Sequence, residues 1–397
     1  MHETYTMSKT ILCLFCLLTA FTCFSQKLHV VEQDYENALR LASDQDKLIF
    51  IDFYTSWCAP CKALDKQIFQ NDSMKQVLAK DFILLKYDAE KDKEFHLSKK
   101  HHVSSYPTAI ILNKDGYVIN REYGFSGEDF QSLSKSVTTF TQESIGYNDN
   151  GETIAGYANT INIENYPTFY IDFVNRDNIK YKDNPEFAAY WNTPQDVLSE
   201  EYFSTLLYFA SNVPEKTADL TLESKENYLN LYGTTDTETL FFFLASGKIN
   251  TAVAEKDETK FNEAIAYTKR ALPNKWTDDL IPMYKTQLLK AQGKWMELYK
   301  INKEKEREGG FSKGAVNYFC WDVYKNCNDS EVIDLCVSWM EQVTSKHPSF
   351  HYLDTYAHLL FKSGNKVETE KIIKETIRIG EKENEKTDHL KSLLDKF

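Results

Sequence analysis

Residues 47–62 read KLIFIDFYTSWCAPCK, and this stretch decides the fold. Its first part, from Leu48 to Tyr54, is an apolar run rich in β-branched and aromatic residues, which predicts a buried strand. A helical pattern follows at once, so Cys58 and Cys61 stand where the strand ends and a helix begins. Because the amino terminus of a helix carries partial positive charge, it favours the thiolate form of a cysteine placed there. The stretch therefore predicts a reactive Cys-x-x-Cys pair.

The residues on either side of this pair alternate between helical and strand patterns. A helix is expected within residues 31–47, and the helix after Cys61 is interrupted at Asn71, which favours a new N-cap. The later elements are expected in this order: a strand at 82–87, a helix at 94–102, strands at 108–112 and 117–122, and a helix at 127–140. The order αβαβαββα predicts an α/β domain.

This part of the chain resembles the thioredoxin superfamily. Besides the Cys-x-x-Cys stretch, the segment HVSSYPTAIIL matches, because Tyr106 and Pro107 stand where the family has its cis-proline. The spacing of CKALDKQIF, NDSMKQVL and DFILLKYDA is most similar to the soluble C-terminal domain of the thiol:disulfide interchange proteins that carry electrons into the periplasm. The resemblance implies a thioredoxin-like domain over residues 26–141, with a central mixed sheet flanked by helices.

The resemblance assigns the chemistry to three residues. It implies that Cys58 attacks, that Cys61 resolves the mixed disulfide, and that Asp52 occupies the position of a buried carboxylate. Cys58 is expected to be the more exposed sulfur, facing the free N–H groups of the helix. Burial would raise the pKa of Asp52 enough to make it a base for Cys61 near neutral pH. In the alternative, Asp52 points outward at a strand edge, and Lys86, which could tune Asp52, is a solvated lysine.

Five further residues are expected to shape the site. Pro60 fixes φ in the first helical turn, and in the family a proline there accompanies a more reducing pair, although Ala59 replaces the usual glycine. A cis bond before Pro107 would turn the backbone of Tyr106 toward the sulfurs, where an extended substrate chain could pair with it. The alternative is a trans loop. Trp57 is expected to shield the disulfide, with a place in the core as the alternative.

Zinc binding is the main chemical alternative for a Cys-x-x-Cys pair, because two such pairs make a zinc site. A second pair is missing from the sequence, and the histidines form no matching knuckle. No metal and no cofactor are therefore expected beyond the redox-active disulfide of Cys58 and Cys61. The net charge of −13 on 397 residues also argues against nucleic acid and anionic membrane surfaces as partners.

The amino terminus has the pattern of an export signal. Lys9 precedes an apolar run at residues 11–24, and Cys23 and Ser25 occupy the small-residue positions before a cut ahead of Gln26. The run is too short for a permanent membrane span; an uncleaved anchor and a lipid anchor on Cys23 are the alternatives. With a signal peptide over residues 1–25, the mature protein is expected in the periplasm or outside the cell.

An odd number of cysteines remains after that cut, so at least one thiol is free or joined to another chain. Cys320 and Cys336 each lie eight residues from a turn at Asn328, so an antiparallel hairpin would bring them level. A disulfide between them is one prediction. The alternative is that these residues and Cys327 are buried free thiols that act as small apolar side chains.

The second half of the chain has a helical pattern. Residues 142–167 are rich in Gly, Asn and Tyr and predict a linker, and residues 168–397 then predict an all-α domain. Turn points recur every 35 or 36 residues, close to the roughly 34-residue unit of tetratricopeptide (TPR) arrays. They fall at Asp257, Gly293, Asn328 and Gly364. A TPR-like array of helical hairpins is therefore expected, with an ordinary helical bundle as the alternative.

These patterns together predict an exported thiol:disulfide oxidoreductase that reduces disulfides of other proteins. A reductant in an oxidising compartment must be recharged, which implies a membrane-bound electron donor. The helical half is expected to bind protein. Two alternatives are a non-catalytic helical binding scaffold that carries a thioredoxin-like module, and a disulfide isomerase.

Overall fold

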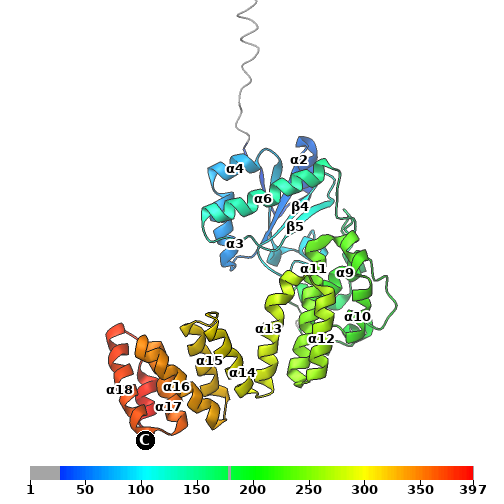
Figure 1. The fold of residues 1–397 in the computed structure, drawn as a ribbon. Coiled ribbons are helices and arrows are strands. Elements are labelled where there is room, and N and C mark those ends of the chain that lie inside the picture. Colours follow the sequence, from blue (N-terminus) through cyan, green and yellow to red (C-terminus); the bar gives the residue numbers. More distant parts are fainter. Residues whose placement is uncertain (1–26, 178–179, 397) are drawn as a thin grey trace, which may run out of the picture. The chain divides into compact units, whose positions relative to one another are not determined.

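The computed structural model describes residues 27–177 and 180–396 of the chain (Figure 1). The expected signal peptide, residues 1–25, lies outside the described residues. The chain divides into two compact units, Met1–Gly247 and Lys248–Phe397. The first contains a sheet with its helices and a further group of helices, and the second is helical throughout its described residues.

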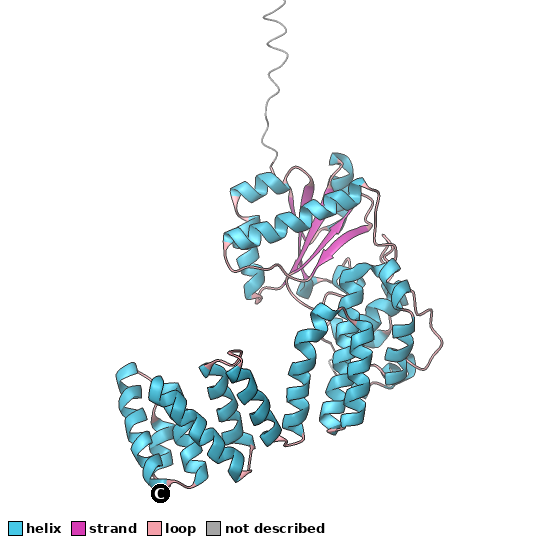
Figure 2. Cartoon of the chain, in the orientation of Figure 1, coloured by secondary structure: helices cyan, strands magenta, loops and turns pink. Residues whose placement is uncertain are grey.

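Within the described residues the strands form one five-stranded sheet, drawn in magenta in Figure 2. The strands are β1 (Val30–Glu32), β2 (Leu48–Tyr54), β3 (Phe82–Asp88), β4 (Thr108–Leu112) and β5 (Val118–Glu122), in the order β1-β3-β2-β4-β5. β2 pairs parallel with β3 and antiparallel with β4. The sheet is therefore mixed, and β2, its apolar central strand, is covered on both sides.

The helices of this part follow the expected order. They are α2 (Tyr35–Gln45), α3 (Ala59–Leu64) with a π-helical turn η1 (Asp65–Phe69), α4 (Asp72–Leu78), α5 (Leu97–Lys100) and α6 (Phe130–Asp149). Asn71 caps α4, as expected, because its Oδ1 accepts the backbone N–H groups of Ser73 and Met74. One core cluster joins Phe50 of β2 to side chains of α3 and α6, including Leu64 and Val137.

Three elements differ from the sequence prediction. β1 lies where a helix was expected to begin, because three residues are too few to show a strand period but suffice to pair with β3 through Val30 and Leu84. The helix expected at 94–102 is the short α5. α6 continues past the expected end at residue 140 to Asp149, and its added part buries Thr141 and Ser144, whose hydroxyls donate to carbonyl groups of the preceding turn.

Five helices follow the sheet in the first compact unit. They are α7 (Thr168–Val174), α8 (Pro185–Tyr190), α9 (Glu200–Phe209), α10 (Glu215–Glu223) and α11 (Lys225–Glu255), which is interrupted by non-helical backbone at Gly233. An aromatic core holds the first of them together, with Phe169 and Tyr170 of α7 packed against Phe187 and Phe209. Aromatic rings supply much buried area per residue, which suits such short helices.

These helices are bound to the sheet by a buried polar seam. Lys100, at the end of α5, donates to Glu200 of α9 at 2.5 Å, and Tyr170 donates to the carbonyl of Lys99 at 2.5 Å. Arg121 of β5 pairs with Asp236 of α11 at 3.3 Å, with 1% of each side chain exposed. Such groups are costly to bury unless each has a partner, so sheet and helices fold as one unit.

The second compact unit is built from antiparallel helices. Its helices are α12 (Glu258–Ala271), α13 (Asn274–Ala291), α14 (Trp295–Arg307), α15 (Lys313–Asn326), α16 (Ser330–Lys346), α17 (Phe350–Ser363), α18 (Lys366–Glu383) and α19 (Asp388–Leu394). The four predicted turn points, Asp257, Gly293, Asn328 and Gly364, each fall between two helices. Among the described residues, no helix combines the length and apolarity that crossing a bilayer requires.

Candidate active site

β2 places Asp52 in the middle of the sheet. Its side chain lies in register between Lys86 of β3 and Ala109 of β4, and the residue is 2% exposed. The alternative of an outward, strand-edge carboxylate is therefore wrong. The apolar neighbours of Asp52 on the strand face the core as well, which is why residue alternation could not reveal its direction.

Cys58 and Cys61 form a disulfide at the start of α3, with their Cα atoms 5.3 Å apart. Cys58 is the N-cap residue, and its Sγ accepts the backbone N–H of Cys61 at 3.1 Å. The free N–H groups of a helix amino terminus stabilise negative charge, so this sulfur is placed to become the thiolate. Cys58 was expected to be the more exposed sulfur, but both cysteines are equally buried, each with 4% exposed.

Ala59 and Pro60 form the first turn of α3 and are both exposed. Neither needs a hydrogen-bond partner inside the helix at this position, so the proline is accommodated without loss of a helical bond. Ala59 and Pro60 therefore determine the backbone conformation between the two cysteines.

Asp52 and Cys61 line the same small cavity, which has a volume of about 110 Å³. Asp65 and Lys86 line it as well, and Lys86 Nζ donates to Asp65 Oδ1 at 2.6 Å. The residue of the inner sulfur, a buried carboxyl and an ion pair therefore line one small pocket. That arrangement allows a proton to pass between Cys61 and Asp52.

Burial raises the pKa of Asp52 to about 7. The charge of Lys86 acts in the opposite direction and lowers it, while the carboxylate of Asp65 raises it again. Lys86 has 19% of its side chain exposed, so it is a paired residue beside Asp52, and the solvated alternative is wrong. Sequence analysis missed Asp65, although it lies one helical turn beyond Cys61.

Trp57 directly precedes Cys58, and the loop that holds Tyr106 and Pro107 contacts the Trp57 ring. The peptide bond between Tyr106 and Pro107 is cis, so the trans alternative is wrong. Trp57 and Tyr106 contact each other edge to face, with ring centroids 6.1 Å apart. Trp57 is 57% exposed, which excludes a place in the core, and the site thus offers an exposed aromatic surface next to the sulfurs.

Two residues on this face were not predicted. Glu90 accepts the indole N–H of Trp57 at 2.9 Å, and Arg176 lies over the Trp57 ring, 5.7 Å from its centroid. Arg176 follows α7, far along the chain from the Cys-x-x-Cys stretch. No local sequence pattern could have joined the two, because their contact depends on how α7 packs against α5.

The remaining cysteines lie outside this site. Cys320, Cys327 and Cys336 are buried free thiols, so the predicted bond between Cys320 and Cys336 is absent. The thiol of Cys320 instead points toward the backbone carbonyl of Cys336 at 3.9 Å. Within residues 27–177 and 180–396, no group of three His, Cys, Asp or Glu side chains is placed to hold a metal ion.

The fold and the paired cysteines define a thioredoxin-like domain with a redox disulfide. Residues 30–114 match the family described as Thioredoxin-like. A thioredoxin of Borreliella burgdorferi is 35% identical over 108 residues, which are 27% of this chain and 87% of that protein. By these matches the chain belongs to the thioredoxin family through this domain.

Two further similarities cover the same part of the chain. The thiol:disulfide interchange protein DsbD of Yersinia pestis is 33% identical over 78 residues, 19% of this chain and 13% of that protein. The solution structure of a thioredoxin from Thermus thermophilus covers 32% of this chain and 95% of its own, at 15% identity and a TM-score of 0.27.

Proposed function

We propose that the protein is an exported thiol:disulfide oxidoreductase that reduces the disulfides of other proteins. The observation that carries the proposal is the Cys58–Cys61 disulfide at the amino terminus of α3, whose inner sulfur shares a cavity with Asp52. A purely structural disulfide would need neither a helix terminus nor a buried carboxyl with a pKa near neutrality.

The reaction starts from the reduced pair. The Cys58 thiolate attacks one sulfur of the substrate disulfide, which forms a mixed disulfide and releases the other substrate sulfur as a thiolate. The backbone N–H of Cys61 and the start of α3 stabilise the Cys58 thiolate before the attack.

The second step returns the pair to the oxidised form. The Asp52 carboxylate takes the proton of the Cys61 thiol, and the resulting thiolate attacks Sγ of Cys58. The Cys58–Cys61 bond forms, the mixed disulfide breaks, and the second substrate sulfur leaves as a thiolate. Two electrons have then passed from the pair to the substrate.

The substrate chain is proposed to lie along Trp57, Tyr106 and Pro107. The exposed ring of Trp57 and the loop before β4 offer apolar contact and backbone groups to an extended peptide. Ala59 and Pro60 tune the potential of the pair, because they fix the backbone between its sulfurs.

The place of the reaction and its electron supply are part of the proposal. The export signal over residues 1–25 directs the protein to the periplasm or beyond the cell. A reductant there requires a recharging partner, for which we propose a membrane-bound donor. The similarity to part of DsbD, a thiol:disulfide interchange protein, supports this place in an electron relay.

The helical half is proposed to bind protein in the manner of a TPR array. The recurrence of turns every 35 or 36 residues, each between two helices, supports this assignment. Stacked helical hairpins offer an extended surface, which could hold a substrate protein or recruit a partner.

Insulin reduction by dithiothreitol tests the catalytic proposal. The wild-type protein should accelerate precipitation of the insulin B chain, and Cys58→Ser should abolish the acceleration. Cys61→Ser should instead stall the reaction at the mixed disulfide, so that substrate proteins remain attached to Cys58 and are released by excess dithiothreitol. A wild-type protein without turnover would favour the non-catalytic scaffold, and a protein that refolds scrambled ribonuclease faster than it reduces insulin would favour the isomerase.

A further inference from the structure

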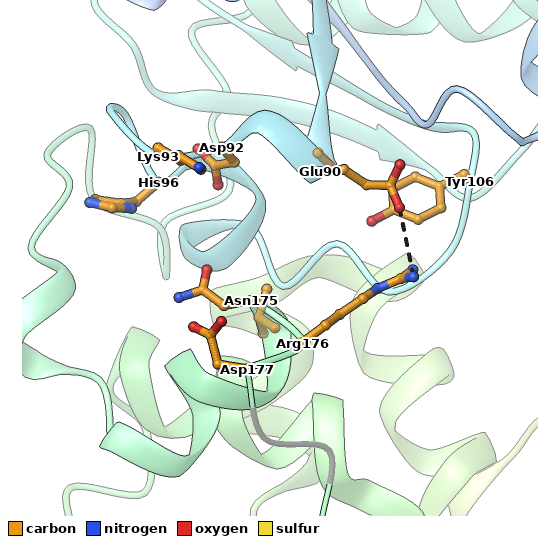
Figure 3. A pocket seen from close by; sticks show the side chains of 10 residues that line it. Glu90, Asp92, Lys93, His96, Tyr106, Asn175, Arg176 and Asp177 are labelled. Carbon is orange, nitrogen blue, oxygen red and sulfur yellow. Dashed lines mark ion pairs between the residues drawn. The ribbon is translucent and has the colours of Figure 1, made fainter.

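A polar pocket of about 460 Å³ opens beside the proposed substrate face (Figure 3). One side is formed by the thioredoxin-like domain, with Glu90 and Tyr106, and the other by the end of α7, with Asn175, Arg176 and Asp177. The pocket thus joins the face that holds the disulfide to helices that the thioredoxin-like match does not include.

Arg176 reaches across this pocket toward the disulfide side. In Figure 3 its side chain extends to Glu90 and Tyr106, away from Asn175 and Asp177. Its guanidinium lies over the Trp57 ring and 3.7 Å from Oε1 of Glu90. That oxygen already accepts the Trp57 indole N–H at 2.9 Å, so the arginine holds only a long contact to it.

The guanidinium therefore keeps most of its donors available. Its side chain is 59% exposed, and a guanidinium has five N–H donors in a planar fork that matches a carboxylate. Lys93 adds a second positive charge to the lining of the pocket, which also carries the carboxyl groups of Glu90, Asp92 and Asp177. A carboxylate that enters from solvent can bind the outer edge of Arg176 without displacing the contact to Trp57.

The backbone of Arg176 takes part in the C-terminal cap of α7. Arg176 ends α7 in the left-handed region, at φ 63°, and its N–H bonds to the carbonyl of Phe173. The next N–H, of Asp177, bonds to the carbonyl of Asp172, which completes a Schellman motif. Glycine is the usual residue at this position, so Arg176→Gly removes the side chain without straining the backbone.

We propose that Arg176 is a specificity-determining residue that binds an acidic side chain of the substrate polypeptide close to its disulfide. This inference rests on the proposed function, because it assumes that a substrate chain lies along Trp57 and Tyr106. The α7 segment is fixed for this role by Tyr170, which donates to the carbonyl of Lys99 at 2.5 Å. The helices after the sheet thus take part in choosing the substrate.

Three peptides test the inference. Each contains one disulfide, and they differ in a single residue beside the attacked cysteine, which is Glu, Ala or Lys. Pre-reduced protein is mixed with each peptide, and the second-order rate constant of thiol release is measured. The wild-type protein should reduce the Glu peptide about fivefold faster than the Lys peptide, which is the effect of one strong exposed ion pair.

Variants of Arg176 separate its charge from a structural role. Arg176→Gly relieves the left-handed backbone, so the protein should stay folded while the three rate constants converge. Arg176→Glu should reverse the preference, in favour of the Lys peptide. Reduction of 2-hydroxyethyl disulfide, which has no charge and no peptide chain, gives the reference rate to which the peptide rates of each variant are normalised.

Lys256→Gly is the matched control. Lys256 also has a left-handed backbone at a helix end, at φ 58°, but it lies in the second compact unit and does not line this pocket. Lys256→Gly should leave the preference for the Glu peptide over the Lys peptide unchanged. Equal rates for the three peptides, or an unchanged preference in Arg176→Gly, would overturn the inference alone. A wild-type protein that reduces neither the peptides nor 2-hydroxyethyl disulfide would overturn the proposed function and this inference with it.

Discussion

Asp52 on β2 lies opposite Lys86 on β3, and the lysine lowers a carboxyl pKa that burial has raised. Lys86 also donates to Asp65 at 2.6 Å, so one cation serves two carboxyl groups. The resulting pKa of Asp52, about 7, lets this group both accept and release a proton near neutral pH.

Asp52→Asn should stabilise the protein at neutral and alkaline pH. The folded pKa of about 7 lies above the unfolded value of about 3.9, so the folded state holds a proton that the unfolded state releases. The free energy of unfolding of the wild type should therefore fall as pH rises from about 4 to about 7. Asp52→Asn should remove this decrease, with a gain of up to about 4 kcal/mol at pH 8 and none at pH 4. Urea unfolding at several pH values measures the free energy of unfolding of both proteins. Parallel pH dependences in the wild type and Asp52→Asn would contradict the prediction.

Lys86→Met should move the pH dependence of insulin reduction to higher pH. Without the cation, the pKa of Asp52 rises further, and more of the carboxyl is protonated at pH 7 and unable to act as a base. The midpoint of the rate profile should shift upward. Lys75→Met, which removes a surface lysine paired with Asp72, is the control and should leave the midpoint in place. A midpoint that stays fixed in Lys86→Met would mean that Asp52 is not the titrating base.

Breaking the Arg121–Asp236 pair should strongly destabilise the first compact unit. Asp236→Ala leaves the Arg121 charge buried without its partner, which costs about 3–5 kcal/mol in comparable pairs. The double variant Arg121→Met with Asp236→Leu should recover part of that loss, since it buries no charge. Urea unfolding of the single and double variants measures the free energy of unfolding of each. A single variant within about 0.5 kcal/mol of wild type would show that the seam does not hold the helices.

His102 should make the protein less stable in mild acid. Burial lowers the pKa of His102 to about 4, below the unfolded value of about 6.5, so the unfolded state binds the proton first. The stability that the neutral histidine provides is present above pH 6.5 and is lost as pH falls toward 4, by about 3 kcal/mol. His102→Gln should weaken this slope. The measurement is best made in the Asp52→Asn background, because Asp52 contributes a slope of opposite sign, and an unchanged slope would exclude His102 as its source.

The three thiols of the second unit should be unreactive in the folded protein. Cys320, Cys327 and Cys336 are fully buried and free, and burial raises the pKa of Cys320 and Cys327 further. After reaction with 5,5′-dithiobis(2-nitrobenzoate), the oxidised protein without residues 1–25 should release no nitrothiobenzoate when folded and three equivalents after unfolding in guanidinium chloride. One equivalent after unfolding would instead indicate that Cys320 and Cys336 are bonded in the isolated protein.

The sequence predicted the residues around the disulfide because their signals are local. The apolar run from Leu48 to Tyr54 has the same limits in β2, and Cys58 and Cys61 begin α3 as their position after the strand indicated. The interruption at Asn71 was predicted from side-chain capping, and Asn71 caps α4. In each case the residue that decides where an element begins or ends lies within a few positions of that boundary.

The parts that the sequence did not reveal depend on contacts between distant residues. The place of Lys86 beside Asp52 depends on the register between two strands. Arg121 and Arg176 gave no local signal, because their partners come from α11 and from the loop around Glu90. A buried arginine on a strand is readily taken for a solvated one until its partner is known.

The buried seam between Lys100 and Glu200 limits how this thioredoxin-like domain can be exchanged between proteins. A domain whose charged side chains are all solvated can be joined to any neighbouring domain by recombination. Here, separating the sheet from the helices that follow it would leave Lys100, with 5% of its side chain exposed, without its counter-ion Glu200. The sheet and these helices therefore have to be inherited together. Changes on one side of the seam are then tolerated only when the other side changes to match.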